Sequence, residues 1–128
     1  DVFISNVICY RPPENRDPNP DEIFAYKPYL SRQIQIINPP IIVTLGRFAM
    51  NYFLPQAKIS RDQGKIFVVH GRCIVPMFHP AAALRSPETM QEFRGTFEKL
   101  LRIIEKCEQV LRDAPPPKKE PLKPNTLF

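Results

Sequence analysis

A histidine in the middle of this chain follows directly on an apolar run and precedes a segment of small residues. Residues 73–78 read CIVPMF, which is the composition of a buried strand, and His79 comes next. Such a strand would carry the imidazole to the carboxyl edge of a sheet, where open α/β folds bind their ligands. Pro80 then fixes the backbone, three alanines permit close approach of another molecule, and Leu84 and Arg85 add an apolar tip and a cation. We therefore expect a binding or catalytic site here.

A polar amide interrupts the first apolar run of the chain. Residues 2–8, VFISNVI, read as a mostly apolar strand, and Asn6 lies near its end. An amide in such a position is either hydrogen-bonded to the backbone or directed at a ligand. The pattern alone leaves both possibilities open.

Composition limits the class of protein. The chain has 128 residues, of which 43% are hydrophobic, enough for one core, and its formal net charge of +5 suits an anionic partner such as nucleic acid. Its three cysteines are far apart and form no CxxC pair, so their spacing predicts neither a disulfide framework nor a complete metal site. No apolar run approaches the ~20 residues of a membrane span, and no signal peptide is present. We expect a cytoplasmic protein, of which this chain, beginning at Asp1, is a fragment or a processed piece.

The hydrophobic pattern predicts alternating helices and strands. Asn19, Pro20 and Glu22 have the spacing of a capped helix start, and the helix should kink or restart at Pro28 before it stops at residues 38–40. The pattern then predicts a strand at 41–45, ended by Gly46, and a helix at 47–54. A hairpin of strands at 65–69 and 73–78 follows, with a solvated His70 in its turn. The last predicted element is a helix capped by Ser86, whose buried stripe includes Phe97, Leu101 and Cys107.

This order of elements predicts an α/β domain at residues 1–113. Residues 114–128 are rich in proline and lysine and are predicted to be a disordered tail that ends in Leu127 and Phe128. Two large apolar residues at the end of such a tail suggest a peptide that enters a pocket on another protein.

Three motifs follow one another along the chain: NVICYRPPENR from Asn6, IVTLG from Ile42, and FHPA from Phe78, with LR shortly after it. In order and spacing they resemble the bacterial and archaeal family 4 uracil-DNA glycosylases. The resemblance implies a three-layer αβα sandwich with a mostly parallel central sheet, and a repair enzyme that hydrolyses the N-glycosidic bond of uracil in DNA after base flipping. It also implies that the family's N-terminal strand and helix, its water-positioning group and its uracil-stacking aromatic residue are missing from this chain.

The resemblance gives roles to two polar side chains. Asn6 matches the asparagine that reads the flipped base, since one amide can pair with both O4 and N3–H of uracil. His79 matches the histidine that hydrogen-bonds uracil O2 while the base leaves as an anion.

The segment after His79 matches the part of the family that enters DNA. Leu84 is the candidate wedge that fills the gap left by the flipped base, and Arg85 is a candidate phosphate contact. Leu84 could instead pack down as the apolar end of the loop, and Arg85 could be solvated. Pro80 and Arg11 are expected at the same DNA surface, and Arg16 is a weaker candidate.

One departure from the family concerns its iron–sulfur cluster. By this alignment the two ligand cysteines of the region are replaced by Tyr10 and Tyr26, and Cys9 is one residue out of position. Tyrosine is a poor substitute for thiolate on such a cluster, so we predict no cofactor. The two tyrosines are expected to pack against each other.

Further expectations concern partners and alternatives. The terminal Leu127 and Phe128 resemble the peptides with which repair proteins bind the replication sliding clamp, although an inert end is the alternative. We expect a monomer. A second reading of the whole chain is a catalytically incomplete DNA- or clamp-binding module derived from the same fold. A generic nucleotide-binding α/β domain is disfavoured because the sequence lacks a phosphate loop.

Overall fold

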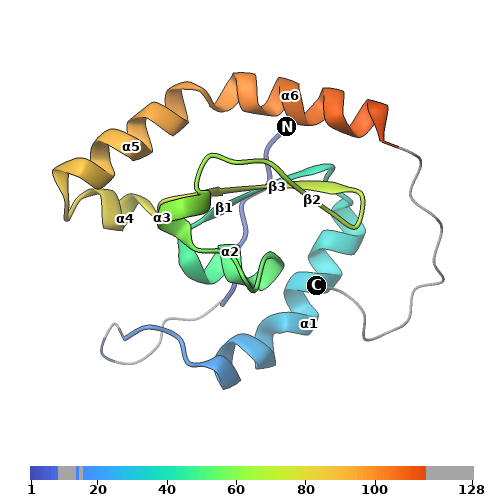
Figure 1. Cartoon of the computed structure of the whole chain (residues 1–128). Coiled ribbons are helices and arrows are strands. Elements are labelled where there is room, and N and C mark those ends of the chain that lie inside the picture. The colour runs from blue at the N-terminus through green and yellow to red at the C-terminus, as the bar shows by residue number, and fades with distance from the viewer. Residues whose placement is uncertain (9–13, 15, 115–128) are drawn as a thin grey trace. The chain divides into compact units, whose positions relative to one another are not determined.

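The computed structural model describes residues 1–8, 14 and 16–114, in two compact units, residues 1–38 and 39–114, that are treated separately below (Figure 1). The first unit contains α1 (Pro20–Ile37). The second contains β1 (Ile41–Leu45), α2 (Arg47–Phe53), α3 (Ile59–Asp62), β2 (Phe67–Val69), β3 (Arg72–Met77), α4 (Pro80–Ala83), α5 (Pro87–Glu98) and α6 (Leu100–Asp113). The predictions made for Tyr10, Arg11, Leu127 and Phe128 lie outside the described residues.

Helix α1 begins with the predicted capping box. Asn19 Oδ1 accepts from the Glu22 backbone N–H at 2.9 Å, and Glu22 Oε2 accepts from the Asn19 backbone N–H at 3.0 Å. Arg16 donates to both Glu22 oxygens and, together with the Asn19 bond, lowers the pKa of that carboxyl to about 2. Arg16, a weaker DNA-surface candidate, thus stabilises a helix start. The predicted start and the stop at Asn38 are confirmed.

Of the predicted kink or restart at Pro28, the restart is wrong, because α1 runs through this residue as one element of 18 residues, while the kink stays a prediction. A proline removes a single hydrogen bond from the ladder, and the capped start and the left-handed Asn38 at the end hold the remaining turns.

The predicted strand at residues 2–8 is also wrong. These residues form no strand, and none of the described residues pairs with them. A mostly apolar run makes a segment suitable for a sheet, but a strand exists only where a neighbour completes its hydrogen bonds.

The sheet has the order β1-β3-β2 and is mixed. β1 and β3 are parallel, with partners running from Ile41 and Cys73 to Leu45 and Met77, whereas β2 and β3 form the predicted antiparallel hairpin. The turn between them uses His70 and Gly71, whose positive φ angles of 49° and 75° are those of the turns that favour hairpins.

Proline is tolerated in the central strand because β2 is short. β2 pairs only with residues 72–74 of β3, so the side of Pro76 turned away from β1 meets a loop rather than a strand. There the Pro76 carbonyl accepts from the Gly64 N–H at 2.7 Å. The missing proline N–H therefore breaks no strand ladder.

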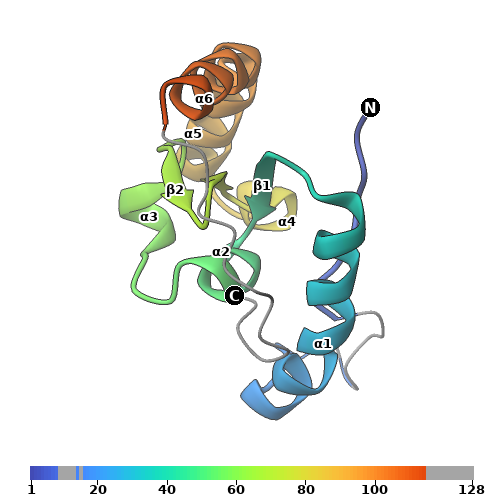
Figure 2. The ribbon, with the colours of Figure 1, turned by 90° about the vertical axis from the view of Figure 1, so that its right-hand side faces the viewer.

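Helices cover both faces of the sheet. α6 and α2 lie on opposite sides of it (Figures 1 and 2). On the α6 side Cys73, Val75 and Cys107 are fully buried, as expected for Cys107. None of the described helices is both long and apolar enough to cross a membrane.

The long final helix departs from its prediction. It begins after Ser86 as predicted, with Ser86 Oγ accepting from the Thr89 N–H, but it is interrupted at Lys99 and continues as a second helix. Phe97, in the first of these helices, and Leu101, in the second, are exposed rather than buried. Helical periodicity alone does not reveal such a break.

A buried hydroxyl gives a test of this packing. Thr44 is only 2% exposed, and its Oγ1 has no hydrogen-bond partner among the described residues. Thr96 is also buried, but its Oγ1 donates to Gln63 Oε1 at 2.7 Å. Thr44→Val should raise the free energy of unfolding by about 1 kcal/mol because it removes an unsatisfied polar group, and Thr96→Val should lower it by about 1 kcal/mol. Chemical denaturation measures both, and a loss of stability in Thr44→Val would contradict the assignment.

Candidate functional site

Two strand ends of the second unit meet at one edge of the sheet. Because β1 and β3 are parallel, their carboxyl ends lie together, and Gly46 and His79 follow these two ends. The Gly46 N–H donates to the Met77 carbonyl at 2.8 Å, which extends the pairing of the strands by one bond. The imidazole is thus delivered to the predicted edge.

Gly46 and His79 approach each other closely. Gly46 has φ +87° and ψ 171°, a conformation essentially restricted to glycine. A Cβ atom built on Gly46 would lie 3.0 Å from His79 Cβ and 3.6 Å from His79 Cδ2. From the sequence this glycine was predicted only to end a strand, although its place between a buried strand and a helix was a signal of close packing.

His79 is the N-cap of α4, which replaces the predicted irregular loop by a single helical turn. Its Nδ1 accepts from the Ala81 backbone N–H at 3.1 Å, and Pro80 occupies the first position of the turn. A neutral imidazole that accepts at Nδ1 carries its proton on Nε2. The exposed side chain of His79 therefore presents an N–H donor to a ligand.

The turn of α4 is anchored by one residue and exposes the next two. Ala83 is buried, whereas Leu84 is 79% exposed and Arg85 is exposed. The alternative in which Leu84 packs down is therefore wrong. Since α4 lies beside α5 in both views, the segment is held between β3 and α5 (Figures 1 and 2).

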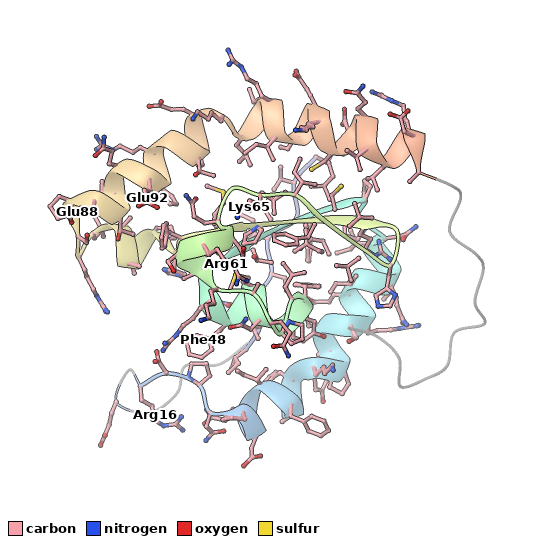
Figure 3. The ribbon with its side chains drawn as sticks, viewed as in Figure 1. Arg16, Phe48, Arg61, Lys65, Glu88 and Glu92 are labelled. Atoms are coloured by element: carbon pink, nitrogen blue, oxygen red, sulfur yellow. The ribbon has the colours of Figure 1, made fainter. Side chains whose placement is uncertain are left out.

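A cation that the sequence analysis did not single out lies at the same edge. Arg47 follows Gly46 directly, and its guanidinium carbon is 4.7 Å from the centre of the Phe48 ring. Phe48 is labelled in Figure 3. Only the position of Arg47 two residues after the end of a strand could have drawn attention to it.

The carboxylate of Asp62 stabilises the fold and is not a candidate for the site. It is buried and accepts from the Lys58 N–H at 2.9 Å, and it forms ion pairs with Arg61 and Lys65, which are labelled in Figure 3. The Arg61 guanidinium holds the pKa of this carboxyl well below its usual range. Asp62 therefore stabilises the N-terminus of α3.

The predicted site residues fall into separate groups. His79, Pro80, Leu84 and Arg85 lie together in one segment of the second unit, whereas Asn6 is an exposed residue of the first unit. The convergence of Asn6 with His79 stays a prediction. The described residues contain no group of three or more His, Cys, Asp or Glu side chains that could hold a metal ion.

The family model described as Uracil DNA glycosylase superfamily matches residues 1–102. The chain belongs to the uracil DNA glycosylase superfamily. Its mixed sheet with a parallel β1–β3 pair and flanking helices agrees with the α/β class predicted for this superfamily.

Individual relatives within the superfamily carry a more specific name. The chain is 38% identical to the type-4 uracil-DNA glycosylase of Archaeoglobus fulgidus, over 88% of this chain and 61% of the relative. It is 42% identical to the type-4 enzyme of Saccharolobus solfataricus (81% of this chain, 52% of the relative) and 44% identical to that of Sulfurisphaera tokodaii (80% and 50%). The chain therefore spans about half to three fifths of the length of these relatives.

Proposed function

We propose that the protein carrying this chain is a uracil-DNA glycosylase, which hydrolyses the N-glycosidic bond of uracil in DNA after base flipping and so initiates base excision repair. The observation that carries the proposal is the geometry of His79. Its imidazole stands exposed at the sheet edge with Nδ1 engaged by Ala81 and an Nε2–H donor available. Relatives named type-4 uracil-DNA glycosylases support the same activity.

In the proposed reaction His79 stabilises the leaving base. When the N-glycosidic bond breaks, negative charge develops on the uracil ring, and the Nε2–H of His79 donates to O2. A donor that is already oriented costs no reorganisation at this moment, and such donors contribute roughly 10²- to 10³-fold in rate. The Ala81 N–H supplies that orientation, because it fixes which nitrogen carries the proton.

The other predicted residues recognise DNA in this proposal. Asn6 pairs with the O4 and N3–H edge of uracil, which distinguishes it from cytosine. Leu84 inserts into the duplex as a wedge, and its exposure supports that role. Arg85 contacts phosphate, while Pro80 and Arg11 belong to the same surface.

We further propose that the protein holds no iron–sulfur cluster. The donor set does not fit one, because Tyr10 and Tyr26 stand where the alignment expects cysteine. Cys73 and Cys107 lie in the core, and burial, with the neighbouring Cys73, raises the pKa of the Cys107 thiol to about 12. A thiol that stays protonated is a poor metal ligand. Tyr26 has Tyr29 as an aromatic neighbour, with ring centres 6.1 Å apart.

The remaining proposals concern location and partners. We place the enzyme in the cytoplasm with the chromosomal DNA, acting as a monomer. Leu127 and Phe128, at the end of a segment rich in proline and lysine, are proposed to bind the sliding clamp, since two neighbouring large apolar residues suit a peptide that docks into a pocket.

Removing the imidazole tests the proposed reaction. His79→Ala in the natural protein that contains this chain should lower uracil excision by about 100-fold, because an oriented donor to the leaving base is lost. Release of uracil and formation of abasic sites in a uracil-containing oligonucleotide measure it. His70→Asn is the control, since it changes the other histidine at a left-handed turn position and should leave the rate unchanged. Binding of the oligonucleotide without any abasic product in the unmodified protein would instead favour the non-catalytic module.

The wedge has its own test. Leu84→Ala should lower excision from duplex DNA by roughly tenfold and excision from single-stranded DNA much less, because only the duplex requires extrusion of the base. Leu101→Ala, which shortens another exposed leucine, is the matched control. Equal losses on both substrates would show that Leu84 does not act as a wedge.

The tail proposal is tested by truncation. Deleting Leu127 and Phe128 should abolish binding to the sliding clamp of the source organism in a calorimetric titration, while excision on short oligonucleotides is unchanged. Alanine substitution of the preceding Asn125 and Thr126 serves as a control for the loss of the apolar pair. Undiminished binding after the deletion would identify the tail as an inert end.

A further inference from the structure

We infer that Gly46 is a positioning residue for His79, because the absence of a side chain at this position determines where the imidazole stands. The catalytic consequence rests on the proposed function. The positional claim rests on geometry alone and has its own measurement below.

A side chain at residue 46 would be closer to His79 than ordinary van der Waals contact allows. A Cβ atom there would lie 3.0 Å from His79 Cβ, 3.6 Å from Cδ2 and 3.7 Å from Cγ. The nearest of these atoms is fixed to the backbone of His79, so a rotation of the side chain cannot relieve the crowding. Relief requires that the backbone of residue 46 or of residue 79 moves.

The backbone of Gly46 is held on both sides. Its N–H donates to the Met77 carbonyl at 2.8 Å, and its carbonyl accepts from the Met50 N–H at 3.0 Å. The first bond joins it to β3 and the second to α2, whose Met50 is buried. Residue 46 is therefore tied to two elements, β3 and α2, whereas His79 begins a helix of only four residues.

The displacement would consequently fall on His79, whose backbone carbonyl accepts from the Ala82 and Ala83 N–H groups of the four-residue helix α4 at 2.9 and 3.2 Å. The Ala81 N–H donates to His79 Nδ1 at 3.1 Å. Ala81 belongs to α4, which is only four residues long. A shift of the His79 backbone misaligns the ring and its Nε2–H. Misplacement of a reacting group by about 1 Å can cost 10²-fold in rate.

The experiment compares two glycine variants in the natural protein. Gly46→Ala adds the methyl group against His79. Gly64→Ala is the matched control, since Gly64 also has a positive φ, +75°, and its Cβ would lie 3.3 Å from Thr96 Cγ2. Both variants introduce a strained alanine against a neighbouring side chain, but only the first neighbour is the imidazole.

Gly46→Ala should lower kcat for uracil excision by about 10- to 100-fold with KM changed less than about threefold, since the donor acts mainly in the transition state. Gly64→Ala should keep kcat near that of the unmodified protein. Rates are measured below the unfolding temperature of both variants. Equal kcat values for the two variants, or a change confined to KM, would overturn the inference.

A second readout does not depend on excision. His79 and His70 are the two histidines of this chain, and His70, in the hairpin turn, is an internal reference in the imidazole nitrogen spectrum. Gly46→Ala should shift the His79 ring nitrogens and the Ala81 amide, and Gly64→Ala should shift neither. If these shifts occur in a protein that excises no uracil, the proposed function fails while the inference stands. If the chemical shifts of the His79 ring nitrogens are unchanged in Gly46→Ala, the inference is overturned, even where the protein excises uracil.

The unmodified protein supplies the last check, which holds even if Gly46→Ala does not fold. A nuclear Overhauser effect between the Gly46 Hα and His79 Hβ protons is expected from their contact, and its absence would overturn the inference. The double variant Gly46→Ala/His79→Ala should excise uracil at the rate of His79→Ala alone, since Gly46 acts through the imidazole. A further loss in the double variant would also contradict the inference.

Discussion

The parallel pairing of β1 with β3 is the interaction on which the candidate site depends. It aligns two carboxyl ends at one edge of the sheet, and its last hydrogen bond, from the Gly46 N–H to the Met77 carbonyl, lies two residues before His79. α6 and α2 cover the two faces of this sheet, and the core residues Cys73 and Val75 belong to the strand that ends at the histidine. A largely buried strand is thus followed, two residues after its end, by an exposed imidazole.

In the segment after this strand, buried residues that anchor the backbone and exposed residues that can contact another molecule lie within a few positions of each other. Ala83 is buried, whereas Leu84 and Arg85 are exposed, and Ser86 caps the next helix. The two exposed residues are consequently held between fixed points rather than on a long loop. In the proposed function this arrangement favours insertion of the segment into DNA, because little conformational freedom is lost when the segment binds.

Much of the fold follows from local rules in the sequence, and the exceptions have physical causes. The capping residues Asn19 and Ser86 and the glycine after β1 were predictable because their effects depend on neighbours a few residues away. The family, and the placement of His79 at a sheet edge, were predictable because ordered motifs and a buried strand mark them. The strand at residues 2–8 was not, since a strand needs a partner that its own sequence does not specify. The interruption at Lys99 leaves no signal, because apolar residues continue at helical spacing on both sides of it.

The register of β1 with β3 also determines when the site comes into being. Ile41 pairs with Cys73, so the partners are 73 − 41 = 32 residues apart in the chain. Helices such as α5 and α6 can form from local contacts, but this ladder must first close a long loop, which is a slow and entropically costly step in folding. An intermediate with its helices formed and this loop still open would leave Gly46 and His79 apart. The chemistry of this segment is therefore a property of the completed fold, acquired at the stage when distant parts of the chain find each other.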